Sequence, residues 1–192
     1  MYSDYRRRAR ELCSNTSGTL AVIYLIYSLI IGAVSYTLIG FIILAGPLTM
    51  GYIETIVKNR NGQEISPGTL FSCFDDFGRH ISVYLLQLLY LILWALIPIA
   101  GFFIVLVKTY SYSMTMYIHR DNPKLSADDC ITESRKMMNG HKMNLFLLHL
   151  SYIGWILLSI LTFGILFLWV GPKMETAQYL FYEDLKDKKE EE

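Results

Sequence analysis

Three long stretches of the sequence contain no Asp, Glu, Lys or Arg: Leu12–Ile53, His80–Val107 and Met143–Pro172. All 17 basic and all 17 acidic residues lie outside them. A soluble chain of 192 residues distributes charge along its amphipathic elements, whereas this chain segregates it. Its apolar fraction of 53% also exceeds the roughly 45–50% of soluble domains. The sequence therefore predicts an all-α integral membrane protein.

The overall charge and the cysteines exclude two other classes of protein. The formal net charge is zero, so no bulk basic character points to nucleic acid as a partner. The three cysteines, Cys13, Cys73 and Cys130, are an odd number and lie in the polar flanks, which does not fit a secreted disulfide framework. We expect reduced, partly buried thiols on a cytoplasmic face. The basic N-terminus resembles a signal peptide, but the apolar run that follows is far longer than about 7–15 residues and predicts a retained membrane segment.

The length of the apolar runs bears on how often the chain crosses the membrane. Their cores are Thr19–Ala45, Ile81–Val107 and Leu145–Val170. As single helices, each would measure about 40 Å, against a hydrocarbon core of about 30 Å. Each run is too long for one upright helix, and it suffices for two if both extend into their polar flanks.

The distribution of basic residues favours the second arrangement. Three spans would put 10 Lys and Arg on one side and 7 on the other, whereas three hairpins put all 17 on one side. The positive-inside rule then favours six helices with both termini in the cytoplasm. Gly and Pro mark turn candidates at Ser35–Gly40, Pro98–Gly101 and Leu161–Gly164. The three tryptophans lie near these turns, as expected in six helices at the outer membrane interface. Three long tilted helices, or hairpins that do not cross, remain open.

The hairpins resemble copies of one another. A displacement of 125 residues superposes Gly46-Pro47 on Gly171-Pro172 and Arg10 on Arg135, and one of 61 superposes Gly40-Phe41 on Gly101-Phe102. The chain is thus interpreted as a single membrane domain of three units, about 1–62, 63–122 and 123–192. Each unit opens with a short amphipathic segment, predicted to lie flat at the cytoplasmic interface with its apolar face in the lipid. Packing of that face against the bundle is the alternative.

Local signals mark where these segments begin and end. Ser66-Pro67 is a plausible N-cap and first residue of a helix, and Ser126 with Asp129 resembles a capping box. Asn139-Gly140-His141-Lys142 predicts a helix stop and restart. The mixed-charge tail, residues 186–192, is expected to be disordered.

The second and third units carry a signature that resembles the bacterial integral-membrane family called domain of unknown function 975. It consists of Lys108–Ile118, Asp121-Asn-Pro, Ser134–Lys142, Leu145-Phe, Leu150–Trp155, Leu161–Gly164 and Phe181-Tyr182. The resemblance is detailed from about Phe71 to Leu185. It implies a multi-pass protein of the bacterial plasma membrane and no particular activity. A more distant likeness to the membrane domains of some glycerophosphodiesterases is an analogy of fold.

Polar residues near the cytoplasmic ends of the second helices are candidates for a cavity. The candidates are Glu54, Lys108, Ser111, Thr115, His149, Glu175 and Gln178. Lys108 could pair there with Glu175 or Glu54, whereas snorkelling of Lys and contact of carboxylates with water are the simpler reading. His149 is either a cavity residue or a neutral ring bonded to a Tyr or Ser hydroxyl.

Other residues are assigned to lipid contact and to helix geometry. Basic residues expected to meet anionic headgroups are Arg6, Arg7, Arg8, Arg10, Arg135, Lys136 and Lys142. Helix kinks are expected at Gly46, Pro47, Gly171 and Pro172. No ligand spacing matches a metal site, and no cofactor is implied.

No catalytic motif appears in the sequence. We therefore expect a non-enzymatic membrane module that binds lipids, or a membrane or cytoplasmic partner protein, from the cytoplasmic side. A small transporter or channel-like protein using the polar ends of the second helices is the alternative, and a lipid-headgroup enzyme comes third.

Overall fold

The computed structural model describes residues 2–35, 38–95 and 101–191, which form helices joined by turns and short loops, and no strand occurs there. The all-α fold is therefore confirmed over these residues. The turns expected at Ser35–Gly40 and Pro98–Gly101 lie partly outside them. The third expected turn, Leu161–Gly164, is present, with positive φ angles of 52° at Phe163 and 84° at Gly164.

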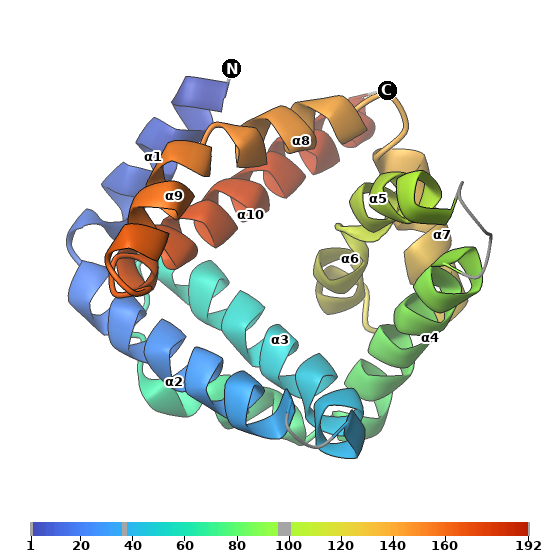
Figure 1. Cartoon of the computed structure of the whole chain (residues 1–192). Helices are drawn as coiled ribbons and strands as arrows, with labels where there is room; N and C mark the ends of the chain where they lie inside the picture. The colour runs from blue at the N-terminus through green and yellow to red at the C-terminus, as the bar shows by residue number, and fades with distance from the viewer. Residues whose placement is uncertain (1, 36–37, 96–100, 192) are drawn as a thin grey trace.

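The helices form three groups along the chain (Figure 1). The first contains α1 (Tyr2–Ser14), α2 (Ser17–Ser35) and α3 (Leu38–Arg60). The second contains the 3-10 helix η1 (Pro67–Phe74), α4 (Phe77–Ala95), α5 (Gly101–Tyr112) and α6 (Thr115–Asp121). The third contains α7 (Ala127–Met137), α8 (Lys142–Leu150), α9 (Ile153–Leu161) and α10 (Phe167–Glu191).

Side-chain and backbone caps explain several of these boundaries. The Ser126 hydroxyl accepts a hydrogen bond from the Asp129 amide at 3.1 Å, which begins α7 as predicted. Gly140 has φ 79°, a left-handed conformation that favours glycine, and it separates α7 from α8. Ser66 makes no side-chain capping bond, although Pro67 does begin η1.

Within the described residues, two helical stretches are long and apolar enough to cross a membrane. They are Phe77–Ala95, of 19 residues, and Lys142–Leu161, of 20 residues. A third span results if Ser3–Ser14 and Ser17–Ala33, which meet at 99°, are counted together. These two or three helices indicate membrane association.

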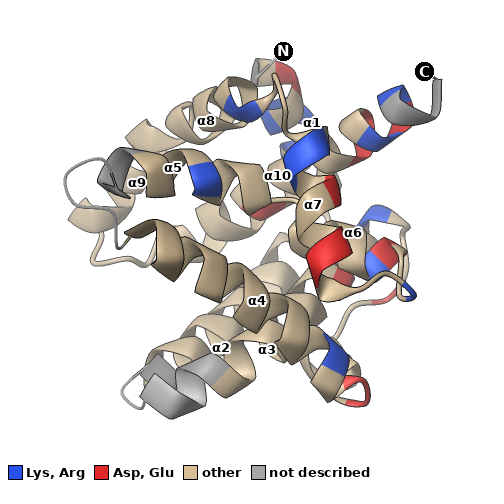
Figure 2. Cartoon of the chain, turned by 90° about the vertical axis from the view of Figure 1, so that its right-hand side faces the viewer, with Lys and Arg blue, Asp and Glu red and all other residues tan. Residues whose placement is uncertain are grey.

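The surface of the molecule agrees with this indication. Around α9 and the turn after it, large apolar side chains face outward, with Leu161 77% and Phe163 98% exposed. In water, such a patch would be an aggregation hazard, whereas lipid accommodates it. Figure 2 shows Lys, Arg, Asp and Glu gathered towards one side, while the side that carries α9 is free of them.

The short helix that opens each group packs on the last helix of another group. α1 lies on α10, η1 on α3, and α7 on α6. In the first pair, the rings of Tyr5 and Phe181 meet edge to face at 5.6 Å. The apolar faces of the short helices, expected in lipid, are instead buried against protein: Ala9, Leu70 and Cys130 have no exposed surface. The amphipathic pattern defines which face is apolar, and long-range packing decides what covers it.

Two segments differ from what the sequence suggests. Lys108–Ile118, a segment of the family signature, is divided between α5 and α6; at the break, the Ser134 hydroxyl accepts from the Met114 amide at 3.2 Å and donates to the Ser111 carbonyl at 2.9 Å. The tail, expected to be disordered, is helical as far as it is described, because α10 continues to Glu191. Its Lys and Glu residues are good helix formers.

The repeated Gly-Pro pairs lie inside α3 and α10, which continue past Pro47 and Pro172. A Cβ atom added to Gly46 would lie 3.0 Å from the His80 carbonyl oxygen, and one added to Gly171 would lie 2.5 Å from the Tyr24 ring. The glycines therefore allow close helix packing. The kinks at these pairs stay a prediction. The cysteines are free, and Cys13 and Cys130 are buried.

Candidate functional site

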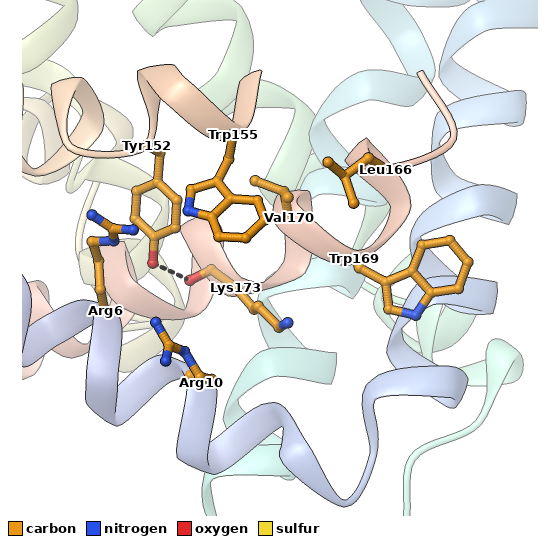
Figure 3. Close-up of a pocket in the computed structure, with 8 residues that line it drawn as sticks. All are labelled: Arg6, Arg10, Tyr152, Trp155, Leu166, Trp169, Val170 and Lys173. Carbon is orange, nitrogen blue, oxygen red and sulfur yellow. Dashed lines mark hydrogen bonds between the residues drawn. The ribbon is translucent and has the colours of Figure 1, made fainter. Parts of the chain in front are cut away.

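A pocket of about 350 Å³ lies where α1 meets α10 and the start of α9 (Figure 3). We call it the α1–α10 pocket. Its lining residues combine cations with aromatic and aliphatic side chains: Arg6, Arg10, Tyr152, Trp155, Leu166, Trp169, Val170 and Lys173.

The cations of the pocket converge from two helices that are distant in sequence. Arg6 and Arg10 are one turn apart on α1, so both project from the same face. Figure 3 shows Arg6 beside the Tyr152 ring and Arg10 below it, while the Lys173 side chain extends from α10 towards the side of the pocket that carries Trp169. Among the described residues, no carboxylate lies within ion-pair distance of these three cations. The pocket therefore has uncompensated positive charge.

Aromatic side chains hold the cations in position and form the apolar wall. The Arg6 guanidinium lies 5.1 Å from the centre of the Tyr152 ring, a cation–π contact. The Tyr152 hydroxyl donates to the Lys173 carbonyl at 3.3 Å, which ties the start of α9 to α10. Trp155 and Trp169 are 43% and 41% exposed, and tryptophan favours the membrane–water boundary.

The remaining arginines of α1 have acidic partners. Arg7 pairs with Asp4 at 2.7 Å, and Arg8 pairs with Asp184 of α10 at 3.1 Å. The expected headgroup contacts of α1 are thus divided, and only Arg6 and Arg10 remain available. Sequence reasoning did not include Tyr152, Trp155, Trp169 and Lys173 among the lipid-contact residues, although the position of both tryptophans near a turn was a usable signal.

The pair expected between Lys108 and a carboxylate does not form. Glu54 instead binds Arg120 at 2.9 Å, and the Lys108 ammonium lies 4.3 Å from the centre of the Trp94 ring. Arg120 comes from α6, which packs on α3, whereas Lys108 comes from α5 and contacts Trp94 of α4. The positions of these residues in the sequence did not indicate that Glu54 pairs with Arg120 rather than with Lys108.

Asp121 organises a second set of contacts at the charged end of the bundle. It accepts from Arg120 at 3.1 Å, from Lys186 at 2.8 Å and from the Tyr182 hydroxyl at 2.9 Å. Burial raises the pKa of Asp121, but these hydrogen bonds and charges outweigh it, so the net direction is downward. The ionised Asp121 carboxylate therefore links α6 to α10, and its role is to stabilise the packing of these two helices.

His149 is bonded rather than free. Its ring nitrogens contact the Tyr110 hydroxyl at 3.5 Å and the Gln178 side-chain oxygen at 3.0 Å. The simpler of the two interpretations of His149, a ring bonded to a neighbouring hydroxyl, therefore describes it.

Glu175 lies among tyrosine side chains. Its carboxylate is within electrostatic reach of four tyrosines from three helices: Tyr24, Tyr27, Tyr52 and Tyr117. Among the described residues, none donates a hydrogen bond to it. The seven cavity candidates thus do not share one cavity: His149 contacts Gln178, Lys108 and Ser111 line another pocket, and Thr115 is fully buried with an unpartnered hydroxyl.

A buried histidine pair was missed by sequence reasoning. His80 Nδ1 and His119 Nε2 are 3.1 Å apart, and the side chains are 4% and 0% exposed. His119 Nδ1 has no partner among the described atoms. No three His, Cys, Asp or Glu side chains in the described part of the chain are close enough to hold a metal ion.

These features define a helical, membrane-associated protein with a basic, aromatic pocket at the edge of its apolar surface. Residues 99–189 match the family described as Protein of unknown function (DUF975), which confirms the resemblance recognised in the sequence for this part of the chain. No curated protein and no solved structure matches the chain. The likeness to glycerophosphodiesterase membrane domains stays a prediction.

Proposed function

We propose that this protein is a six-span membrane module of three hairpins that binds an anionic phospholipid from the cytoplasmic side, in the α1–α10 pocket. The observation that carries the proposal is the convergence of Arg6, Arg10 and Lys173, without described acidic partners, beside an apolar and aromatic wall.

The cyclic packing of the short helices supports three equivalent hairpins. α1 rests on the last helix of the third group, η1 on the last helix of the first, and α7 on the last helix of the second. The short helix of each unit thus packs on the last helix of the unit before it, and the short helix of the first unit packs on the last helix of the third. The three units therefore form a closed ring. Figure 1 is consistent with three helix groups arranged around the molecule.

The one-sided charge supports the orientation. The charged residues gather towards one side of the molecule in Figure 2, together with the charged end of α10. Basic residues concentrate on the cytoplasmic side of membrane proteins. The α1–α10 pocket contains Arg6, Arg10 and Lys173 of this basic set.

The chemistry of the pocket suits a phospholipid better than a soluble anion. Guanidinium groups form charge-assisted hydrogen bonds with phosphate oxygens. Leu166 and Val170 add an aliphatic wall, against which the start of an acyl chain can pack. Trp155 and Trp169 line the same pocket and add aromatic surface.

The test compares Arg6→Gln/Arg10→Gln with wild type in lipid nanodiscs, by titration of a fluorescent anionic phospholipid. At about 1 kcal/mol for each surface charge, we expect about thirtyfold weaker binding. The matched control is Arg7→Gln/Lys124→Gln, which removes two exposed charges elsewhere and should bind as wild type does. If both double variants weakened lipid binding equally, the effect would come from overall charge, and binding in the α1–α10 pocket would be contradicted.

A further inference from the structure

A second basic pocket lies between α5, α7 and the start of α8, with a volume of about 420 Å³. We call it the α5–α7 pocket. Its cations are Lys108, Arg135, Lys136 and Lys142, and Ser111 and Asn139 add polar side chains to its lining.

Most of this charge is not neutralised by the protein. Lys136 pairs with Glu133 at 2.8 Å. Lys108, Arg135 and Lys142 have no described carboxylate within ion-pair distance, and Lys108 lies within electrostatic reach of the other two cations. Like charges that converge without a counterion favour an anionic ligand, because the ligand relieves their repulsion.

Trp94 holds the lysine of this pocket in place. The Lys108 ammonium lies 4.3 Å from the centre of the Trp94 ring, and this cation–π contact fixes its direction. A preorganised cation costs less to order when a ligand arrives.

The two basic pockets take the same residue types from corresponding elements. In each, a short amphipathic helix supplies arginine, the first long helix of a group supplies tryptophan, and the helix after it supplies lysine. The α1–α10 pocket takes these from Arg10, Trp155 and Lys173. The α5–α7 pocket takes them from Arg135, Trp94 and Lys108, although this tryptophan lies behind the lysine rather than on the pocket wall. Arg10 and Arg135 are 125 positions apart, and Trp94 and Trp155 are 61 apart, the two spacings that relate the hairpins.

The third junction of the ring, where η1 meets α3, is closed, and its short helix supplies no basic side chain. A Cβ atom added to Gly51 would lie 2.1 Å from the Leu70 carbonyl oxygen, so the two backbones are in direct contact. Residues 63–78 contain no Lys or Arg. The repeat thus provides two open basic junctions and one closed junction.

We propose that the α5–α7 pocket is a second phosphate-binding site, equivalent through the repeat to the α1–α10 pocket, a step that rests on the proposed function. Its lining is polar throughout, so the bound phosphate belongs either to a lipid headgroup or to a soluble phosphate compound. The two sites act side by side on the charged face, and each takes one phosphate group.

The experiment counts bound anionic phospholipid, phosphatidic acid, by native mass spectrometry of protein released from nanodiscs of otherwise neutral lipid. Wild type should retain two molecules. Arg135→Gln/Lys142→Gln should retain one, with affinity at the lost site about thirtyfold weaker, and Arg6→Gln/Arg10→Gln should also retain one. The charge-retaining variant Arg135→Lys/Lys142→Arg should keep two, which separates loss of charge from loss of fold. A second arm titrates inorganic phosphate into protein in neutral nanodiscs and follows Trp94 fluorescence. A response that Arg135→Gln/Lys142→Gln abolishes assigns the site to a soluble phosphate.

The outcomes distinguish the two proposals. A single lipid in wild type, lost only in Arg6→Gln/Arg10→Gln, together with no phosphate response, overturns the second site and leaves the proposed function intact. No retained lipid in any protein overturns the proposed function, and the phosphate arm then decides the second site alone.

Discussion

At the scale of residues, side chains of the same type differ in whether they form ion pairs, because different groups lie opposite them. Four arginines of α1 are close together in sequence, yet Arg7 and Arg8 are paired with acids while Arg6 and Arg10 face a pocket. The partner of Arg8, Asp184, lies 176 positions away. A carboxylate at such a distance leaves no mark on the local sequence, so the pairing of Arg8 could not be recognised there, whereas Asp4, the partner of Arg7, is only three residues away.

The buried pair His80 and His119 predicts a loss of stability in mild acid. Burial, and then the neighbouring His80 and Arg79, lower the pKa of His119 to about 4, outweighing the opposite effect of Asp76. The folded value lies below the ordinary 6.5, so the unfolded chain binds the proton first. Stability is therefore full above about pH 6.5 and falls as the pH drops towards 4, by up to about 1.4 kcal/mol per pH unit.

Thermal unfolding of detergent-solubilised protein between pH 7.5 and 5 measures this slope. His119→Gln removes the titrating group and should flatten the curve, even if it lowers stability at pH 7.5. A curve of unchanged slope in that variant would assign the acid sensitivity to other groups.

At the scale of elements, the sequence revealed the amphipathic segments, their caps and the Gly140 and Gly164 turns, because these depend on neighbouring residues. It did not reveal that α5 ends where Ser134 from α7 bonds its last turn. Nor did it reveal what covers α1, η1 and α7. An apolar face is equally satisfied by lipid or by another helix, and only the tertiary contacts distinguish the two.

Two helical glycines should respond in opposite directions to substitution by alanine, because only one of them lies in the contact between α3 and η1. Gly51→Ala forces the backbone at Leu70 to move, and we expect it to destabilise the fold by about 1–3 kcal/mol. Gly32, inside α2, has nothing within 4 Å of an added Cβ, so Gly32→Ala should stabilise by about 0.5–1 kcal/mol. Chemical denaturation in mixed micelles checks both, and a destabilisation of the same size in the two variants would argue against the close contact.

At the scale of the whole molecule, the six-span arrangement predicts the exposure of three turns. In a variant lacking the native cysteines, Thr37→Cys, Gly101→Cys and Phe163→Cys should each react with a membrane-impermeant thiol reagent added outside intact cells. Lys124→Cys, on the charged side, is the matched control and should react only after permeabilisation. Protection of the three turn positions in intact cells would contradict six spans and restore long tilted helices or hairpins that do not cross.

The sequence alone determined that the chain associates with a membrane, that it is helical and that short amphipathic segments alternate with apolar helices. These properties follow from hydropathy and from local hydrogen bonding, which act over a few residues. Only the tertiary structure decided that Glu54 binds Arg120 rather than Lys108, that the short helices pack on protein, and that Arg6, Arg10 and Lys173 face one pocket. Each of those outcomes joins segments far apart in the chain, and packing geometry rather than local preference selects among many chemically equivalent partners.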